Sequence, residues 1–157
     1  MIEGVEVKEL KRHGDSRGFL MEILRGSDAI KADGPGAFGQ YYLGAVHPAV
    51  VKGRHRHFAQ DDHICIIMGR AAVHLEDGRD GSKTKGAKQV ILAGEEHGWK
   101  LVRIPRGVWH SVENIGSETC YLVNYVTTEY DAKKPDEERG EFDVKDKKMP
   151  WEVLKTG

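Results

Sequence analysis

Short apolar segments, separated by turns that contain glycine, run through most of this chain. The sequence holds 19 glycines, and segments such as 5–10 alternate apolar and polar residues. A period of two is typical of strands with one buried face, and short, regular spacing favours a sandwich or barrel. Because the connections are too short for helical crossovers, we expect antiparallel pairing. The predicted strands are 5–10, 19–24, 40–43, 50–58, 64–68, 71–75, 89–92, 101–104, 109–113 and 119–127.

The chain of 157 residues is expected to form one domain, 1–157, with the barrel over about 2–130. From 131 onward charged residues dominate. This composition predicts a charged C-terminal tail, 131–157, that forms a solvated helix or loop on the outside of the barrel. Gly69 and Arg70, between two predicted strands, indicate a tight hairpin.

The overall charge excludes some classes of partner. Lys and Arg number 24 against 25 Asp and Glu, for a net charge of -1, so no basic surface for nucleic acid or membrane is expected. The N-terminus lacks a secretory signal pattern, and no apolar run reaches the roughly 20 residues that span a bilayer. Cys65 and Cys120 lie in apolar runs, which is typical of reduced core cysteines. We therefore expect a cytoplasmic protein.

Two histidine motifs contain the candidate residues for metal binding or acid–base catalysis. The first contains His55 and His57, and the second, about fifty residues later, ends at His110. Side chains alternate along a strand, so His55 and His57 point one way while Arg54 and Arg56 point the other. A histidine from a distant strand can join the pair inside a small barrel. Three imidazoles in one cavity form either a metal site or an acid–base site.

The two motifs resemble those of the cupin superfamily. Residues 105–114, Pro-x-Gly-x-x-His-x-x-x-Asn, match its second motif, and residues 53–69 match its first in part. Asp62 stands where the superfamily usually has Glu, and its shorter side chain leaves Gln60, His63 or water as other fourth ligands. Cupins that keep the full set bind one divalent transition-metal ion. In this chain the corresponding ligands are His55, His57, Asp62 and His110.

A more specific resemblance covers residues 2–130. Its pieces, in chain order, are Asp15-x-Arg17-Gly18-Phe19-x-x-Glu22, Phe38-Gly39-Gln40, Lys52-Gly53-Arg54-His55, Leu75-x-Asp77-x-Arg79 and Tyr125-x-x-Thr128-x-Tyr130. In this order they resemble the dTDP-4-dehydrorhamnose 3,5-epimerases and related nucleotide-sugar isomerases, a cupin branch. The resemblance implies an antiparallel jelly-roll barrel and an isomerase that moves a proton at the carbon next to the ketone of a 4-keto-6-deoxy sugar.

The resemblance also implies roles for individual residues. His55 matches the general base, a task that suits imidazole, and Tyr125 matches the acid on the other face of the sugar. No cofactor is implied. Phe19 and Glu22 match positions that reach the nucleotide of a neighbouring subunit through an exchanged N-terminal strand, which implies a homodimer. The expected substrate-binding residues are Arg17, Phe19, Glu22, Gln40, Lys52, Arg54 and His57.

Two departures from the family pattern concern the site. A lysine that stabilises the enolate oxygen normally follows Gln60, whereas this chain has 61–63, Asp-Asp-His. Since an enolate needs some electrophile at its oxygen, His63, His110 or a metal ion are the candidates. The family also supports its base with a late aspartate, for which Asp131 and Asp143 are the candidates here.

These departures keep other functions open. A histidine whose lone pair ligates a metal cannot accept a proton, so a metal at His55 excludes the base mechanism. The alternatives are a metal-binding cupin, acting on a sugar phosphate or as an oxygenase, and a catalytically inactive cupin that binds a sugar or nucleotide. A single-site epimerase or a 3,4-ketoisomerase also fits the resemblance.

Overall fold

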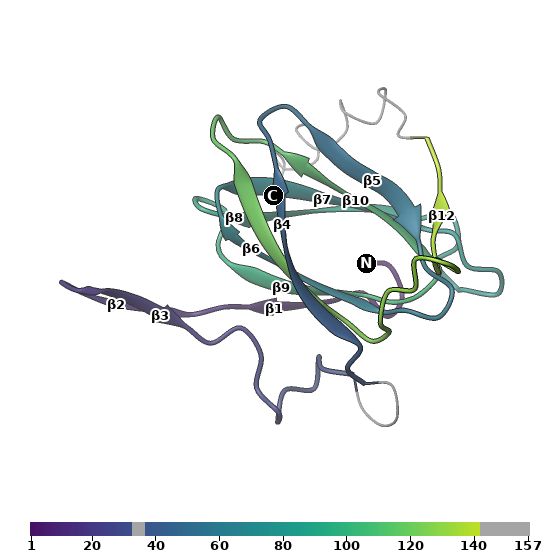
Figure 1. Ribbon diagram of the computed structural model, residues 1–157, viewed down its shortest axis with the longest axis horizontal. Coiled ribbons are helices and arrows are strands. Elements are labelled where there is room, and N and C mark those ends of the chain that lie inside the picture. Colours follow the sequence, from purple (N-terminus) through teal and green to yellow (C-terminus); the bar gives the residue numbers. More distant parts are fainter. Residues whose placement is uncertain (33–36, 142–157) are drawn as a thin grey trace.

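Two five-stranded antiparallel sheets face each other in the computed structural model, which describes residues 1–32 and 37–141 (Figure 1). In pairing order, the first sheet consists of β1 (Glu6–Glu9), β9 (Lys100–Ile104), β6 (Asp62–Met68), β11 (Cys120–Val126) and β4 (Gln40–Val46). The second sheet consists of β12 (Glu138–Arg139), β5 (Val51–Arg56), β10 (Val108–Asn114), β7 (Arg70–Asp77) and β8 (Lys88–Gly94). The predicted all-β jelly-roll fold is confirmed.

The main core lies between the two sheets. Alternate residues of each strand point inward, as the sequence pattern requires, and Ile66, Val73 and Val102 are almost fully buried there. A second apolar cluster covers the outer face of the first sheet, where Ile30 packs with Val123. Strands β6 and β11 are therefore buried on both faces along much of their length.

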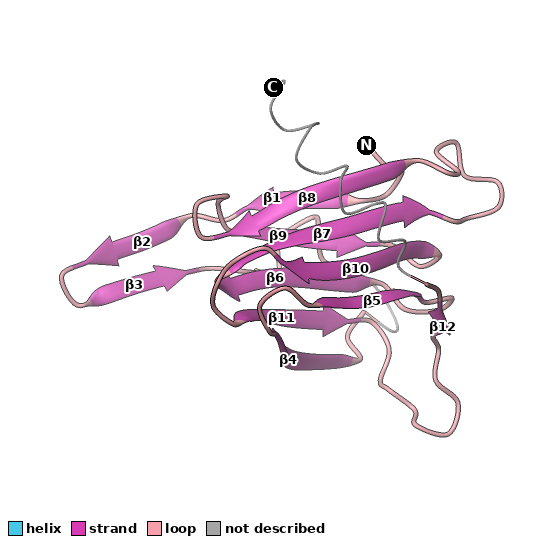
Figure 2. Cartoon of the chain, turned by 90° about the horizontal axis from the view of Figure 1, so that it is seen from above, coloured by secondary structure: helices cyan, strands magenta, loops and turns pink. Residues whose placement is uncertain are grey.

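The N-terminal region differs from the prediction of one strand at 19–24. It forms a hairpin of β2 (Arg12–Asp15) and β3 (Gly18–Met21), which extends beyond the end of the barrel in both views (Figures 1 and 2). Phe19 and Leu20 on this hairpin are 53% and 61% exposed. A glycine-containing turn between two short strands was the local signal for this hairpin.

Two other expectations about local structure need correction. Gly69 does not close a hairpin, because β6 and β7 belong to different sheets, so this turn is a corner between them. The beginning of the charged tail, 131–137, is a mostly exposed loop as expected, but it then forms β12, which pairs with β5, and residues before β12 lie over an opening of the barrel. Residues 142–157 lie outside the described part of the chain.

Other predictions from composition can be compared with the structure. Cys65 and Cys120 are both buried and free, as expected for core thiols. In the described residues, no helix has the length and apolarity that a membrane crossing needs.

Candidate active site

A cavity of about 320 Å³ opens at one end of the barrel. Strands β4 and β11 of the first sheet and β5 of the second contribute its walls, and the segment before β12 lies at its opening. Its lining residues are Gln40, Tyr42, His55, His57, Gln60, Val126, Thr128, Glu129, Tyr130, Asp131, Lys134, Asp136 and Glu137. The sequence analysis named five of these residues: Gln40, His55 and His57 as parts of the site, Gln60 as another possible ligand, and Asp131 as a possible support for the base.

The three predicted histidines come together beside this cavity. His110 on β10 pairs directly with His55 on β5, and their ring centroids are 4.3 Å apart. The His57 ring lies 5.2 Å from His55 and 5.5 Å from His110. Gly53 makes this approach of strands feasible, because a Cβ there would lie 2.7 Å from the His110 carbonyl oxygen. Its φ of 100° also favours glycine.

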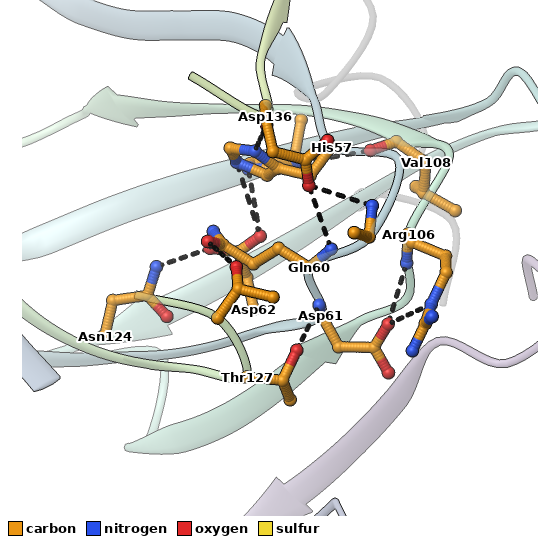
Figure 3. Close-up of polar contacts among 12 residues, drawn as sticks. His57, Gln60, Asp61, Asp62, Arg106, Val108, Asn124, Thr127 and Asp136 are labelled. Atoms are coloured by element: carbon orange, nitrogen blue, oxygen red, sulfur yellow. Dashed lines mark hydrogen bonds and ion pairs between the residues drawn. The ribbon is translucent and has the colours of Figure 1, made fainter. Parts of the chain in front are cut away.

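Asp62 completes the cluster from the first sheet (Figure 3). Its Oδ2 lies 3.6 Å from Nε2 of His57 and 3.7 Å from Nε2 of His110, and its side chain is 2% exposed. Its Oδ1 accepts hydrogen bonds from Nε2 of Gln60 at 3.2 Å and Nδ2 of Asn124 at 2.7 Å. The carboxylate is thus oriented by two amides, with one oxygen directed at the imidazoles.

The surroundings fix the protonation of this cluster. Nδ1 of His110 donates to the carbonyl of Val108 at 3.1 Å, and Nδ1 of His57 donates to the carbonyl of Asp136. Burial lowers the pKa of His110, and burial with repulsion from His110 and His57 lowers the pKa of His55 to about 4. At neutral pH the His55 and His110 imidazoles are therefore neutral, and Nε2 of His110 presents a lone pair to Asp62.

These residues fit a divalent transition metal. The nitrogen donors of the three histidines all lie within 4.8 Å of one another. The Nδ1–H groups of His57 and His110 donate to backbone carbonyls, which is the outer-shell arrangement that fixes metal-ligating histidines. Asp62 faces both Nε2 atoms despite being one methylene shorter than the glutamate of the cupin motif. His63, a candidate replacement ligand, points away from the cluster.

Tyr125 and His63 occupy the opposite face of the first sheet. They are paired residues on β11 and β6, and their rings stack with centroids 4.5 Å apart. The Tyr125 hydroxyl donates to the carbonyl of Ala37, and Nε2 of His63 lies 3.0 Å from the carbonyl of Ile30. Both line an outer pocket of about 550 Å³ that the segment after β3 borders. The structure therefore does not bring these two predicted catalytic residues to the His55 cavity.

The predicted phosphate-binding cations also lie away from the cavity of their own chain. Arg54 points outward, where its guanidinium pairs with Glu76 at 2.5 Å and lies 4.7 Å from the Trp109 ring centroid. Lys52 donates to the carbonyl of Ala45. Arg17 sits at the tip of the β2–β3 hairpin, where it pairs with Asp15. Phe19 follows on β3, whereas Glu22 comes after β3 and pairs with Arg25. Such outward placement of Arg54 follows from strand alternation, which turns it away from His55.

Several cavity residues were missed by the sequence analysis. Tyr42 lies on β4, and Lys134, Asp136 and Glu137 come from the charged tail. Asp136 caps the turn after β5 by accepting from the backbone N–H groups of residues 58–60, and Glu137 interacts electrostatically with His55. A charged segment without apolar periodicity gives no signal for its docking site. Of the two predicted supports for the base, Asp131 lines the cavity and Asp143 lies outside the described residues.

Comparison with known proteins shows which family the chain belongs to. Residues 13–138 match the family described as the polysaccharide biosynthesis C-terminal domain. The chain is 37% identical over 152 residues to the probable low-salt glycan biosynthesis epimerase Agl13 of Haloferax volcanii, covering 96% of this chain and 94% of that protein. It is 36% identical to the spore coat polysaccharide biosynthesis protein SpsL of Bacillus subtilis, covering 97% and 91%.

A solved structure of a similar protein has the same fold. The dTDP sugar isomerase from Desulfovibrio desulfuricans superposes with a TM-score of 0.82 at 25% identity, covering 96% of this chain and 92% of that chain. The predicted kinship with cupin-type sugar epimerases is confirmed, and the chain belongs to the polysaccharide biosynthesis C-terminal domain family.

Proposed function

We propose that this protein epimerises a nucleotide-linked 4-keto-6-deoxy sugar by proton transfer at the carbon next to the ketone. The observation that carries the proposal is a neutral imidazole, His55, in the wall of a cavity of about 320 Å³. This volume is near the lower end of the roughly 300–1,000 Å³ of small-molecule sites, which suits a sugar ring inside and a nucleotide outside. The epimerase and dTDP sugar isomerase names of two similar proteins support this reaction class.

His55 is the base of the proposed reaction. Its neutral ring accepts the proton from carbon, and the electrons of the broken C–H bond form the enolate. The negative charges of Glu137 and Asp62 both favour the imidazolium that results. Removal and return of one proton at the same carbon leaves the oxidation state unchanged, so this reaction needs no redox cofactor.

The diphosphate of the substrate requires nearby cations, and a single chain supplies few of them at the cavity. The described residues that line the cavity include one lysine, Lys134, and four carboxylates, those of Glu129, Asp131, Asp136 and Glu137. The exposed β2–β3 hairpin carries Arg17 away from its own barrel. In our proposal a homodimer exchanges these hairpins, so that Arg17 and Phe19 of one copy reach the nucleotide in the other.

The two buried thiols support our proposal of a cytoplasmic location. Cys65 and Cys120 are free and buried, and burial raises the pKa of Cys65 to about 12 and that of Cys120 to about 11. Inert, unpaired cysteines are typical of a reducing compartment. The proposed epimerase therefore works in the cytoplasm, on a sugar destined for a polysaccharide.

A second candidate function is that of a metal-binding cupin. It is favoured by the Nε2 atoms of His57 and His110, which both face the buried Asp62 carboxylate. The residues that would hold the ion are His55, His57, His110 and Asp62, and a bound ion would supply a Lewis acid for a ketone or phosphate oxygen. In that case His55 is not the base.

The test is deuterium incorporation from heavy water into dTDP-4-keto-6-deoxyglucose. The wild type is expected to exchange the proton next to the ketone, and His55→Asn to lose about 10²-fold or more. His47→Asn is the matched control, because His47 is exposed in the turn between β4 and β5 and is not among the described residues that line the cavity. Wild-type protein that binds dTDP without any exchange would indicate an inactive binding cupin.

Metal content separates the two candidates. Protein purified without added metal is analysed for transition ions, and exchange is measured before and after chelation. Full exchange in chelated, metal-free protein supports His55 as the base. A stoichiometric ion whose removal abolishes exchange supports the metal-binding cupin instead.

A further inference from the structure

Tyr42 lies across the cavity from the proposed base. It belongs to β4 of the first sheet and His55 belongs to β5 of the second, and these two strands are labelled in Figure 1. Both side chains line the same cavity. Strand alternation places Gln40 and Tyr42 on the cavity side of β4, while Tyr41 lines the outer pocket. A sugar bound in this cavity is therefore flanked by an imidazole from one sheet and a phenol from the other.

The Tyr42 hydroxyl is held through its oxygen. Nδ2 of Asn124 donates to it at 2.8 Å and also donates to Oδ1 of Asp62 at 2.7 Å. Oδ1 of Asn124 accepts from the backbone N–H of His63 at 3.0 Å, so the amide is fixed at both ends. Since Asn124 is 2% exposed and Asp62 equally buried, this is a preformed arrangement (Figure 3).

This arrangement leaves the Tyr42 proton available. A phenol has one O–H donor, and the bond from Asn124 uses only the oxygen as acceptor. Among residues 1–32 and 37–141, no acceptor for that proton is within hydrogen-bonding distance. Burial and the nearby Asp62 raise the pKa of Tyr42, which keeps the hydroxyl protonated at neutral pH.

The other tyrosines are less suited to this task. The Tyr125 hydroxyl is on the outer face of the sheet and donates to the Ala37 carbonyl. Tyr130 lines the cavity opening, but it is 63% exposed, and among the described residues only its backbone N–H has a hydrogen bond, to Gln40. Of the cavity tyrosines, Tyr42 alone has a hydroxyl fixed by a buried partner in the described part of the chain.

We propose that Tyr42 is the catalytic acid that protonates the enolate on the face opposite His55. This inference rests on the proposed epimerase function. His55 takes the proton from carbon on one face, and the C–H electrons become the enolate double bond. The enolate carbon then takes the Tyr42 proton on the other face, the C=O bond re-forms, and the phenolate that remains is reprotonated from water. His55 returns its proton to water, so the cycle is balanced.

The test separates proton removal from inversion. With dTDP-4-keto-6-deoxyglucose in heavy water, Tyr42→Phe is expected to keep deuterium incorporation with retained configuration, because His55 can return a deuteron to the face it deprotonated. Formation of the inverted epimer is expected to fall by about 10²-fold or more. Tyr41→Phe is the matched control, because Tyr41 is the neighbouring residue on β4 but lines the outer pocket, and it is expected to invert normally. The melting temperature and dTDP affinity of each variant verify that the fold and nucleotide site are intact.

The outcomes distinguish this inference from the proposed function. If wild type inverts the sugar and Tyr42→Phe does so at the same rate, Tyr42 is not the acid, while the epimerase function stands. If Tyr42→Phe loses exchange and inversion equally, Tyr42 acts in binding or positioning, and the acid role is also overturned. If wild type exchanges no proton with this substrate, the proposed function itself fails.

Discussion

Oδ2 of Asp62 faces Nε2 of His57 at 3.6 Å. The Nδ1–H of His57 is already directed at the Asp136 carbonyl, and the same opposition occurs with His110 at 3.7 Å. Oδ2 of Asp62 and the lone pair on Nε2 of the neutral His110 therefore share a buried space of low dielectric constant, where repulsion is weakly screened. A bound cation or a donor group at this point would relieve the repulsion.

Replacement of Asp62 by asparagine is expected to stabilise the metal-free protein. An amide keeps an oxygen for Gln60 and Asn124 and places N–H donors toward the two histidines. A gained hydrogen bond contributes about 1 kcal/mol, and Asp62→Ala should instead destabilise by leaving both amide donors unpaired. Urea unfolding of chelated protein measures both variants. Loss of stability in Asp62→Asn would show that the carboxylate charge is compensated.

Stability is expected to fall as the pH is lowered from about 6.5 toward 4. Burial lowers the pKa of His55 to about 4 and lowers those of His63 and His110, so the unfolded chain binds more protons in this range. Each such histidine contributes a slope of about 1.4 kcal/mol per pH unit. The lowered pKa values of Asp61 and Asp77 matter only below their usual value of 3.8. Urea unfolding at several pH values tests this, and a flat profile contradicts neutral buried histidines.

Asp61 is expected to be important for stability near the cavity. Its buried carboxylate pairs with Arg103 and Arg106, each at 3.1 Å, and also accepts from the backbone N–H of Arg106. Asp61→Ala is expected to lower the free energy of unfolding by about 1.5–3 kcal/mol, the range for hydrogen bonds to charged groups. The control, Asp80→Ala, removes an exposed pair with Lys85 and should change nothing measurable. Equal effects of the two changes would contradict this role.

Tyr125→Phe is expected to leave catalysis unchanged within about twofold, because no acid–base contribution is removed. The variant keeps the ring that stacks with His63 and loses the hydrogen bond to Ala37, which costs about 1 kcal/mol of stability. Parallel measurement of epimer formation and thermal unfolding checks both statements. A large loss of inversion with a normal melting temperature would mean that Tyr125 reaches the substrate.

Hairpin exchange predicts complementation between two inactive variants. Arg17→Ala retains His55 but lacks the proposed phosphate contact, whereas His55→Asn retains the hairpin with Arg17. Mixed dimers, formed by refolding the two together, are expected to regain activity at one of their two sites. Sedimentation establishes the dimer, and each variant refolded alone is the control. Absence of regained activity in verified mixed dimers would place Arg17 in the site of its own chain or outside the site altogether.

The placement of the histidine pair was predictable from local rules. A strand turns successive side chains to opposite faces, so His55 and His57 share one side and Arg54 the other, whatever the rest of the fold does. The glycine before them and the turn before His110 also follow from local backbone requirements. These features depend on covalent geometry over a few residues and do not need the partner strands.

No local sequence pattern could predict whether Tyr125 lies inside or outside the barrel. Alternation states that Asn124 and Tyr125 face opposite ways, but both faces of β11 are apolar and buried, so the pattern does not reveal which face is the interior. That choice follows from the pairing of β11 with β6, which sets Val126 opposite Asp62 and Tyr125 opposite His63.

The sequence by itself thus determined an antiparallel barrel, its family and the histidine cluster, because strand periodicity and short motifs encode them. Only the tertiary structure decided that Tyr42 rather than Tyr125 lines the cavity with His55, that Asp62 completes the histidine cluster, and that part of the charged tail borders the cavity. The physical reason is that these contacts arise from strand register and docking between segments far apart in the chain, and such contacts leave no periodic signal.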